Sequence, residues 1–290
     1  MTSTCELLGV SRQVYYRAKN SIKRKQRIAQ TVVELVREVR NQMPRIGTRK
    51  LYHILYEDLQ NIGVGRDKLF MILKANHMEI SPRRSYHITT NSYHRFYKHR
   101  NMVQGRVPVK PEQLWVSDIT YIGSRVNPMY LALVTDAYSK KIVGYDLSNS
   151  LETQGTIRAF KMAVKKRSYS NESLIHHSDR GIQYCSNEYQ NVLNMNNIKC
   201  SMTESYDPYE NAVAERVNGI LKQEFIIDNK HKKLSVMKKL IANSIDIYNN
   251  LRPHYSCFMR TPEQMHRQEK VRIRTYRRKN GSKNELATIN

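Results

Sequence analysis

The chain has 290 residues and a formal net charge of +24, and 40% of its residues are hydrophobic. This length accommodates one large domain or two to three small ones, and the hydrophobic content is sufficient for a folded core. Because there is no apolar run of about 18 residues and no apolar N-terminal leader, we expect a cytoplasmic protein without a membrane span. The four cysteines are scattered without a C-x-x-C pair, which argues against a disulfide framework and a zinc finger.

The positive charge is concentrated toward the two ends of the chain. Residues 1–110 hold 22 Lys and Arg against 7 Asp and Glu, for a net charge of +15. Residues 111–228 hold 12 against 14, a net charge of −2, and residues 229–290 hold 15 against 4, a net charge of +11. Basic segments around a nearly neutral centre are typical of proteins that bind a polyanion such as nucleic acid. A ribosomal-type or merely soluble basic protein is the alternative.

The first 20 residues carry a short helix-turn-helix pattern. The turn is predicted at Gly9, and Ser11 is expected to cap a helix that presents Arg12 to a DNA groove. Little sequence precedes the turn, so we interpret residues 1–20 as a partial helix-turn-helix. A capped helix that only packs against the protein is the alternative.

Residues 21–80 are predicted to form a helical DNA-binding domain. The hydrophobic pattern predicts helices over residues 23–40, over 49–59 with Thr48 as the cap, and over 66–76. Arg66 and Lys68 are expected to face DNA. A purely structural three-helix bundle is the alternative.

Residues 81–110 are polar and basic, and tyrosines alternate with the basic residues. A segment without an apolar face but rich in Arg and Tyr suits a phosphate backbone. We interpret it as a basic linker that becomes ordered on DNA. The residues expected to contact DNA here are Arg83, Arg84, Arg95 and Arg100.

From Glu112 the hydrophobic pattern changes from helical to β. Residues 115–122, 129–136 and 142–147 are apolar runs separated by turn residues, which predicts an antiparallel three-stranded meander. The elements expected next are a helix over 152–166, a strand from Leu174, a helix from the Ser186 cap to Met195, a strand over 198–202 and a helix capped by Asn211. Helices over 234–249 and from Thr261 complete a domain of residues 111–266, and residues 267–290 are predicted to be a disordered basic tail.

Three acidic residues lie where this pattern brings them together. Asp118 is in the middle of the first strand, Asp179 ends the Leu174 strand, and Glu215 is in the first turns of the helix after Asn211. Burying converging carboxylates against a sheet is costly unless a cation compensates, and a divalent metal is the commonest one. Lys222 follows on the same face of that helix, roughly 10 Å along its axis. Taken alone, Glu215 and Lys222 are typical of a solvated helix surface.

The spacing and the flanking sequences together resemble a known family. Sixty residues lie between Asp118 and Asp179 and thirty-five between Asp179 and Glu215, which is similar to the DDE signature of transposases and retroviral integrases. Glu210 stands where the family usually has Asp. Four segments within roughly residues 5–268 resemble the second-reading-frame transposase of the IS-three family of bacterial insertion sequences, namely Trp115–Tyr121 (WVSDITY), His177–Tyr184 (HSDRGIQY), Tyr209–Glu215 (YENAVAE) and Tyr248–His254 (YNNLRPH).

This resemblance implies an α/β fold, with an RNase H-like catalytic core of a mixed five-stranded sheet and helices after a helix-turn-helix DNA-binding region. It implies a metal-dependent polynucleotidyl transferase that cleaves insertion-sequence ends and joins them to target DNA. Asp118, Asp179 and Glu215 are expected to hold two Mg²⁺ ions, for which Mn²⁺ can substitute. The further residues expected to contact DNA are Lys222, Arg180 and Gln183.

The expected partner is double-stranded DNA, both the terminal inverted repeats of the element and the target. A homo-oligomer on nucleoid DNA is expected, with an upstream-frame protein as a possible fusion or partner. Two alternatives stay open: a DNA-binding regulator of transposition without catalysis, and an RNase H-type nuclease.

Overall fold

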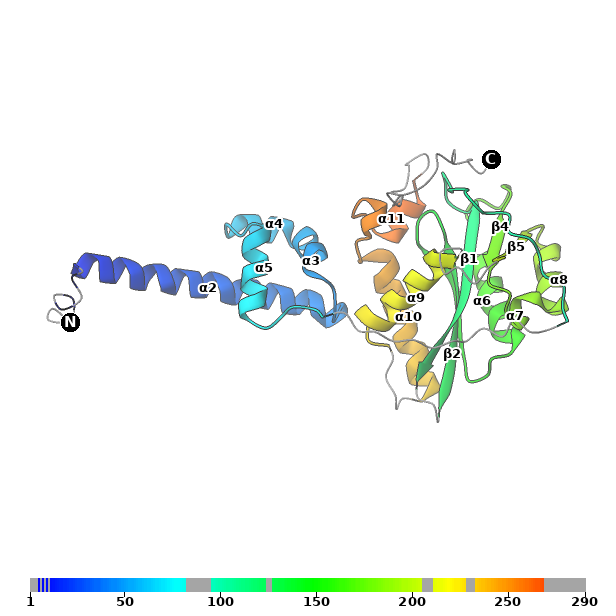
Figure 1. Cartoon of the computed structure of the whole chain (residues 1–290), viewed down its shortest axis with the longest axis horizontal. Coiled ribbons are helices and arrows are strands. Elements are labelled where there is room, and N and C mark those ends of the chain that lie inside the picture. The colour runs from blue at the N-terminus through cyan, green and yellow to red at the C-terminus, as the bar shows by residue number, and fades with distance from the viewer. Residues whose placement is uncertain are drawn as a thin grey trace. The chain divides into compact units, whose positions relative to one another are not determined.

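The computed structural model describes residues 11–81, 95–123, 127–204, 211–227 and 233–268, together with Cys5, Leu7 and Gly9. The chain divides into two compact units, Met1–Pro82 and Arg83–Asn290 (Figure 1). No helix in these described ranges is both long and apolar enough to cross a membrane. Arg83, Arg84, Glu210 and residues 269–290 of the expected tail lie outside the described residues.

The first unit is built on one long helix, α2 (Arg12–Gln42). The hydroxyl of Ser11 caps it by accepting the N–H of Val14 at 3.3 Å, and Gly9 has a φ of +65°, as expected for a turn. The helix then continues without a break past residue 20, although a separate helix was expected from residue 23. The segment contains no Gly or Pro, so nothing in its sequence interrupts the backbone hydrogen bonds.

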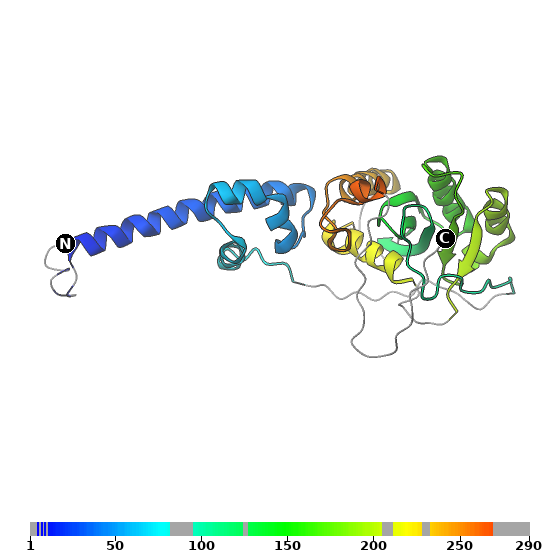
Figure 2. The same ribbon diagram turned by 90° about the horizontal axis from the view of Figure 1, so that it is seen from above.

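Three shorter helices, α3 (Thr48–Ile54), α4 (Tyr56–Asn61) and α5 (Arg66–Ala75), complete this unit. The single helix expected over 49–59 is wrong, because the chain kinks at Leu55 while keeping that side chain buried. Thr48 is the first residue of α3 and not its cap. The first half of α2 extends beyond these three helices (Figure 2). The buried core consists mainly of Val32, Val36, Ile46, Leu51, Leu59, Leu69 and Leu73.

The second unit contains a mixed five-stranded sheet in the order β3-β2-β1-β4-β5. Strands β1 (Leu114–Gly123), β2 (Pro128–Asp136) and β3 (Ile142–Ser148) form the predicted antiparallel meander. Strands β4 (Ile175–Ser178) and β5 (Lys199–Met202) extend the sheet in parallel with β1. This is the RNase H-like arrangement expected from the sequence, with β1 at the centre.

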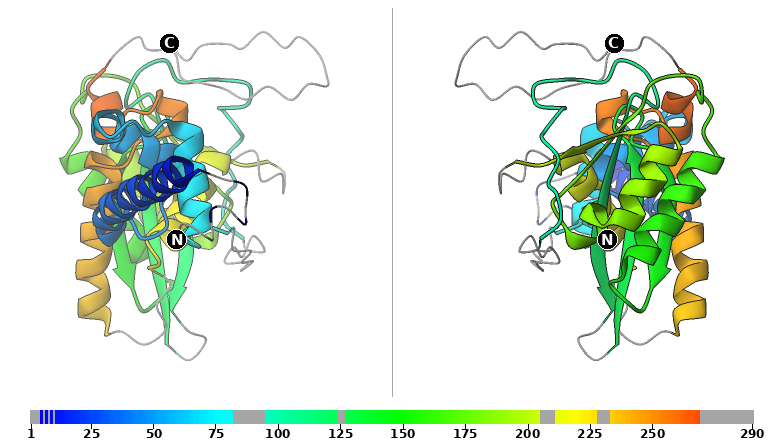
Figure 3. Two further views of the ribbon diagram at one scale, coloured as in Figure 1. Left: turned by 90° about the vertical axis from the view of Figure 1, so that its left-hand side faces the viewer. Right: turned by 90° about the vertical axis from the view of Figure 1, so that its right-hand side faces the viewer.

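Helices cover both faces of this sheet because successive side chains of β1 point in opposite directions. Trp115 packs against Phe160 of α6, with ring centroids 6.1 Å apart, whereas Val116 belongs to a cluster with Ala214 of α9. Accordingly, α6 and α9 lie on opposite sides of β1 (Figures 1 and 3). The helices are α6 (Thr153–Lys165), α7 (Ile182–Cys185), α8 (Asn187–Met195), α9 (Ala212–Glu224), α10 (Leu234–Asn250) and α11 (Pro262–His266), with a 3₁₀ turn at Tyr255–Cys257.

The close packing of α6 on β3 depends on Gly144. A Cβ atom at this position would lie 2.1 Å from the carbonyl oxygen of Ala159. Because no larger residue fits in this space, the glycine determines how near α6 approaches the sheet.

A buried polar cluster attaches α11 to the sheet. His266 places Nε2 3.4 Å from Oε1 of Glu112 and Nδ1 3.8 Å from Oδ1 of Asp136. Ser139 donates its backbone N–H and its hydroxyl to Oδ1 of Asp136, both at 2.7 Å. Burial opposes the charged imidazole, but the hydrogen bonds with the two carboxylates outweigh it and raise the pKa of His266 to about 9.

We predict that the second unit loses stability as the pH rises from about 6.5, the ordinary pKa of histidine, toward about 9, the pKa of folded His266. Because the folded state holds this proton more tightly, the stabilisation is complete below the lower value and is lost above the higher one. The measurement is urea unfolding across this range, followed by the fluorescence of Trp115, the single tryptophan.

His266→Gln should lower the unfolding midpoint at neutral pH and flatten its dependence on pH. The exposed His53, in the first unit, provides the control substitution His53→Gln. A wild-type midpoint that stays constant between the two pH limits would contradict the prediction.

Candidate active site

The register of the central strands brings the first two acids together. Strands β1 and β4 run parallel, with Val116 opposite His177. Asp118 lies two residues after Val116, and Asp179 lies two residues after His177. The two acids are therefore level with each other across the β1–β4 pair. Asp179 comes directly after Ser178, the last residue of β4. The two carboxylates therefore lie beside each other where β4 ends.

A tight turn holds Asp179 in place. Its Oδ1 accepts the backbone N–H of Gly181 at 3.1 Å. A Cβ atom at residue 181 would lie 3.0 Å from the same oxygen, which is closer than nearly all real Cβ contacts. A glycine two residues after Asp179 thus allows the turn and the hydrogen bond together.

Helix α9 supplies the third acid, because it packs against β1 and carries the exposed Glu215 in its first turn. Asn211 is the N-cap residue of α9, as expected, but its side chain makes no cap hydrogen bond. Asn211 is buried, and its Nδ2 donates to the carbonyl oxygen of Ser117 at 3.1 Å. This amide therefore attaches the start of α9 to β1.

Asn218, one turn after Glu215, contacts the first acid directly. It is 5% exposed, and its Nδ2 donates to Oδ2 of Asp118 at 2.7 Å. Asn218 was not among the residues predicted from the sequence. A buried amide three residues after a functional glutamate, on the same helix face, was the available signal.

Asp118 is the electrostatic centre of the site. Burial, then the charges of Asp179 and Glu215, raise the pKa of Asp118 to about 7, against the opposing hydrogen bond from Asn218. Partial burial also raises the pKa of Glu215. A cation would relieve the repulsion that Asp179 and Glu215 exert on Asp118.

As the side chains stand, no group of three His, Cys, Asp or Glu within the described ranges is gathered closely enough to hold a metal ion. The donor set is nevertheless suited to one, since carboxylate oxygens are the ligands that Mg²⁺ prefers. The three carboxylates therefore suit a divalent cation chemically, although in this structure they are too far apart to bind one together.

A buried ion pair holds the far end of α9. Nε and Nη2 of Arg252 donate to the two carboxylate oxygens of Glu224, each at 2.8 Å. Arg252 is 1% exposed and lies over the ring of Tyr248 at 5.6 Å. The sequence indicated Arg252 only as part of a family motif, and the structure gives it a role in joining α9 to the end of α10.

The DNA-contact residues predicted in the core differ in their surroundings. Lys222 on α9 and Arg180 beside Asp179 are both half-buried. Gln183, in contrast, is buried, and its Nε2 donates to the carbonyl oxygen of Leu151 at 2.8 Å. Gln183 therefore stabilises the loop before α6, and its contact with DNA stays a prediction.

In the first unit, the predicted DNA-contact residues lie at the starts of helices. Arg12 is exposed at the first position of α2. Arg66 begins α5 and pairs with Asp67 at 2.9 Å. Lys68 is half-buried and donates to the carbonyl oxygen of Gly63 at 3.3 Å. These three cations belong to a different compact unit from the three acids.

The described part of the expected linker, residues 95–110, lies on the second unit. The N–H of Asn101 donates to Oε1 of Glu204 at 2.7 Å, and the N–H of Met102 donates to Oγ of Ser201 at 2.9 Å. The carbonyl oxygen of Arg100 also accepts the N–H of Met202 at 3.4 Å, so this part follows the outer edge of β5. The expected ordering of the linker on DNA stays a prediction. Arg95 and Arg100 within it are exposed.

Comparisons with known proteins agree with this architecture. Residues 108–208 and residues 196–262 match two family models, each described as an integrase core domain. The chain is 33% identical over 258 residues to the "insertion element IS600 uncharacterized 31 kDa protein" of Shigella sonnei, covering 86% of this chain and 92% of the relative.

Two further similarities are more limited in extent or in strength. The chain is 34% identical over 155 residues to the transposase InsF for insertion sequence IS3A of Escherichia coli K12, covering 53% of this chain and 54% of that protein. The solved HTLV-2 integrase catalytic core domain in complex with magnesium is 22% identical with a TM-score of 0.44, covering 55% of this chain and 99% of that one. From its extended match to the IS600 protein and its integrase core domain, the chain belongs to the IS3 family of insertion-sequence transposases.

Proposed function

We propose that this protein is a DDE transposase that cleaves the ends of its insertion sequence and joins them to target DNA. The observation that supports this most is the convergence of Asp179 and Glu215 on Asp118 from three separate elements of the fold. Acids that share a site at such electrostatic cost are characteristic of functional centres.

In this proposal, Asp118, Asp179 and Glu215 would together hold two Mg²⁺ ions through their carboxylate oxygens, with Asp118 as the common ligand. When bound, such ions activate a water or a 3′-hydroxyl as the nucleophile and stabilise the leaving oxygen. Mn²⁺ has a similar preference for oxygen ligands and can replace Mg²⁺.

The protein's own contribution is to hold the ligands in position. Asn218 restrains the carboxylate of Asp118, and the N–H of Gly181 restrains that of Asp179. Glu215 is carried by a helix attached at its start through Asn211 and at its end through the ion pair of Arg252. A site restrained at these points loses less entropy when the ligands close around the ions.

The proposed partner is double-stranded DNA, first the terminal inverted repeats and then the target. The first half of α2 supports this, because residues 12–27 contain seven Lys and Arg and no Asp or Glu. A homo-oligomer assembled on DNA, with an upstream-frame protein as fusion or partner, completes the proposal. The protein then acts at the nucleoid, where its substrate is.

We predict that Asp118→Asn, Asp179→Asn and Glu215→Gln each reduce cleavage and joining by roughly three orders of magnitude, because each removes a metal ligand. DNA binding should stay near normal or become tighter, since a negative charge near phosphate is lost. The measurement is Mg²⁺-dependent processing and joining of oligonucleotides that carry the element's ends, with binding measured separately.

The exposed Asp246 of α10 provides the matched control Asp246→Asn. Wild-type strand transfer by any one of the three variants would disprove the assignment. Wild-type binding without any joining would favour a non-catalytic regulator, and cleavage of any duplex without joining would favour an RNase H-type nuclease.

We predict that Lys222→Ala slows joining by about tenfold or more, because a charged contact to the phosphate or end bases of the DNA is lost. Lys222→Arg keeps the charge but changes its geometry and should have a milder effect. Lys222 lies roughly 10 Å along α9 from Glu215, so metal binding should survive in both variants. The neighbouring Gln223→Ala is the control, and joining by Lys222→Ala at wild-type rates across a range of salt would refute this role.

We predict that Arg66→Gln and Lys68→Gln weaken binding to the element's ends and make it less dependent on salt. Each lost phosphate contact should reduce the slope of log affinity against log salt by about 0.9. Lys238, an exposed cation of α10, gives the control Lys238→Gln. Unchanged slopes in both variants would favour the structural three-helix bundle.

A further inference from the structure

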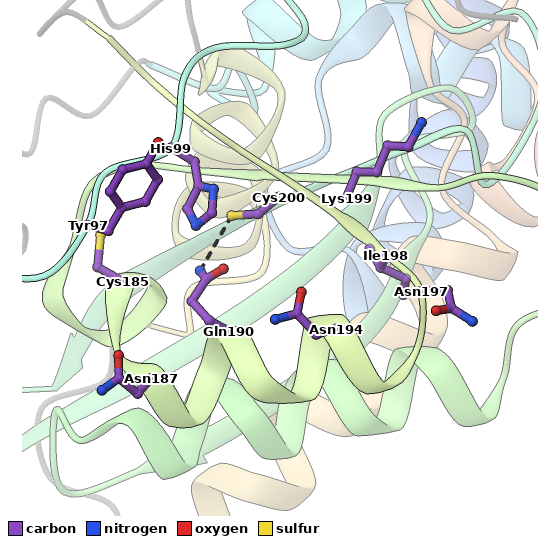
Figure 4. Close-up of a pocket in the computed structure, with 10 residues that line it drawn as sticks. All are labelled: Tyr97, His99, Cys185, Asn187, Gln190, Asn194, Asn197, Ile198, Lys199 and Cys200. Atoms are coloured by element: carbon purple, nitrogen blue, oxygen red, sulfur yellow. Dashed lines mark hydrogen bonds between the residues drawn. The ribbon is translucent and has the colours of Figure 1, made fainter.

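A pocket lies beside β5, at the edge of the sheet opposite β3. The pocket, of about 490 Å³, opens between the segment that contains Tyr97 and His99, the helix α8 and the strand β5 (Figure 4). This volume is within the range of about 300–1,000 Å³ that is usual for small-ligand sites. Its lining residues are Tyr97, His99, Cys185, Asn187, Gln190, Asn194, Asn197, Ile198, Lys199 and Cys200.

The wall that carries Tyr97 and His99 is held firmly against the core. Phe96 packs against the main hydrophobic cluster, immediately before Tyr97. On the other side of His99, the backbone bonds of Asn101 and Met102 fasten the segment to the residues of β5 and its end. The rings of Tyr97 and His99 contact each other edge to face, with centroids 4.9 Å apart. The pocket is thus a built feature of the unit.

The opposite wall is a row of amides. Asn187, Gln190 and Asn194 follow one another at intervals of three and four residues, which places them on one face of α8. In Figure 4 the amides of Gln190 and Asn194 point from α8 toward the two rings. Gln190 is oriented by hydrogen bonds from its Nε2 to the carbonyl oxygen of Tyr184 at 2.7 Å and to Sγ of Cys200 at 3.4 Å.

The lining chemistry is neutral apart from one cation. None of the ten lining residues is a carboxylate, so the lining offers no negative charge to a metal cation. Burial raises the pKa of both Cys185 and Cys200 to about 11, so the neutral thiol is the favoured form of each at neutral pH. The one charged group in the lining is the exposed Lys199.

We propose that this pocket binds an unpaired nucleobase of the DNA, with Tyr97 and His99 as the stacking surface and the amides of Asn187 and Asn194 reading the base edge. Asn and Gln amides pair with the donor and acceptor of adenine, so adenine is the base that fits best. Lys199 is placed to neutralise the adjoining phosphate. The inference rests on DNA being the partner in the proposed function.

The position of the pocket is consistent with a nucleotide near the reacting one. Cys185, which lines the pocket, is the last residue of α7, and α7 follows the turn that contains Asp179 and Gly181. The same stretch of chain therefore contributes to both sites. A base displaced from the helix close to the cleaved bond has to be held by stacking or it returns to the duplex.

The test uses the full chain and a short single strand in which 2-aminopurine, a fluorescent analogue of adenine, replaces one base. Stacking on Tyr97 should quench the fluorescence, and Tyr97→Ala should weaken this binding roughly tenfold. Tyr97→Phe retains the ring and should bind as the wild type does. Asn194→Leu, which removes an amide of the opposite wall, should cost several-fold in the affinity of an adenine strand that displaces this probe, because 2-aminopurine lacks the 6-amino group that the amide reads.

Asn191→Leu, an exposed position of α8 outside the pocket lining, is the matched control. Tyr97 and Asn194 are themselves exposed, and Trp115 fluorescence checks that each variant is folded. A strand containing photoreactive 8-azidoadenine should crosslink to Tyr97 or His99. Crosslinks confined to other segments, or wild-type quenching by Tyr97→Ala together with wild-type displacement of the probe by the adenine strand in Asn194→Leu, would overturn the proposal.

Parallel measurements distinguish an error in the pocket assignment from an error in the proposed function. Asp118→Asn, which should be inactive in joining, should still quench 2-aminopurine fully. If the wild type joins DNA ends while its quenching is insensitive to the pocket variants, only the pocket assignment is wrong. If quenching follows the pocket variants but the wild type joins no ends, the pocket stands and the proposed function is wrong.

Discussion

The attachment of α9 to the central strand is the constraint on which the candidate active site depends. A helix that brings a carboxylate toward two others works against electrostatic repulsion, so its position has to be maintained by other contacts. Two amides of α9 provide them, since Asn211 bonds the backbone of Ser117 and Asn218 bonds the carboxylate of Asp118. Both amides are buried, where such bonds are costly to break.

The opposite end of α9 is also held in position by a buried polar contact, in this case an ion pair. The ion pair of Arg252 and Glu224 is buried, and a buried pair becomes strongly destabilising when one partner is removed. Similar logic applies to α11, where His266 lies between Glu112 and Asp136. The helices that follow the sheet are therefore held by buried polar groups as well as by apolar packing, which defines where α9 and the C-terminal helices lie.

The charge distribution separates two tasks. The first unit carries a helix whose exposed half is rich in cations, while the second unit concentrates three acids beside the end of β4. Acids repel the phosphate backbone unless cations intervene, so a protein that acts on DNA with such a centre needs its binding surface elsewhere. The amide pocket beside β5 adds a surface of a third kind, neutral and aromatic, that is suited to bases and not to the backbone.

The sequence by itself determined the order of the elements in the second unit, because strand alternation, helical periodicity and turn residues are local signals. The acidic triplet and the central position of β1 were expected from motif spacing and from the resemblance to a known family. The sequence also indicated the Ser11 cap of α2 and the Ser186 cap of α8. The tertiary structure alone decided that Asn211 bonds β1, that Asn218 contacts Asp118 and that Gln183 is buried. The partners of these three amides are distant in sequence or belong to other elements, so the bonds arise only when the chain has packed and each buried polar group must find a partner.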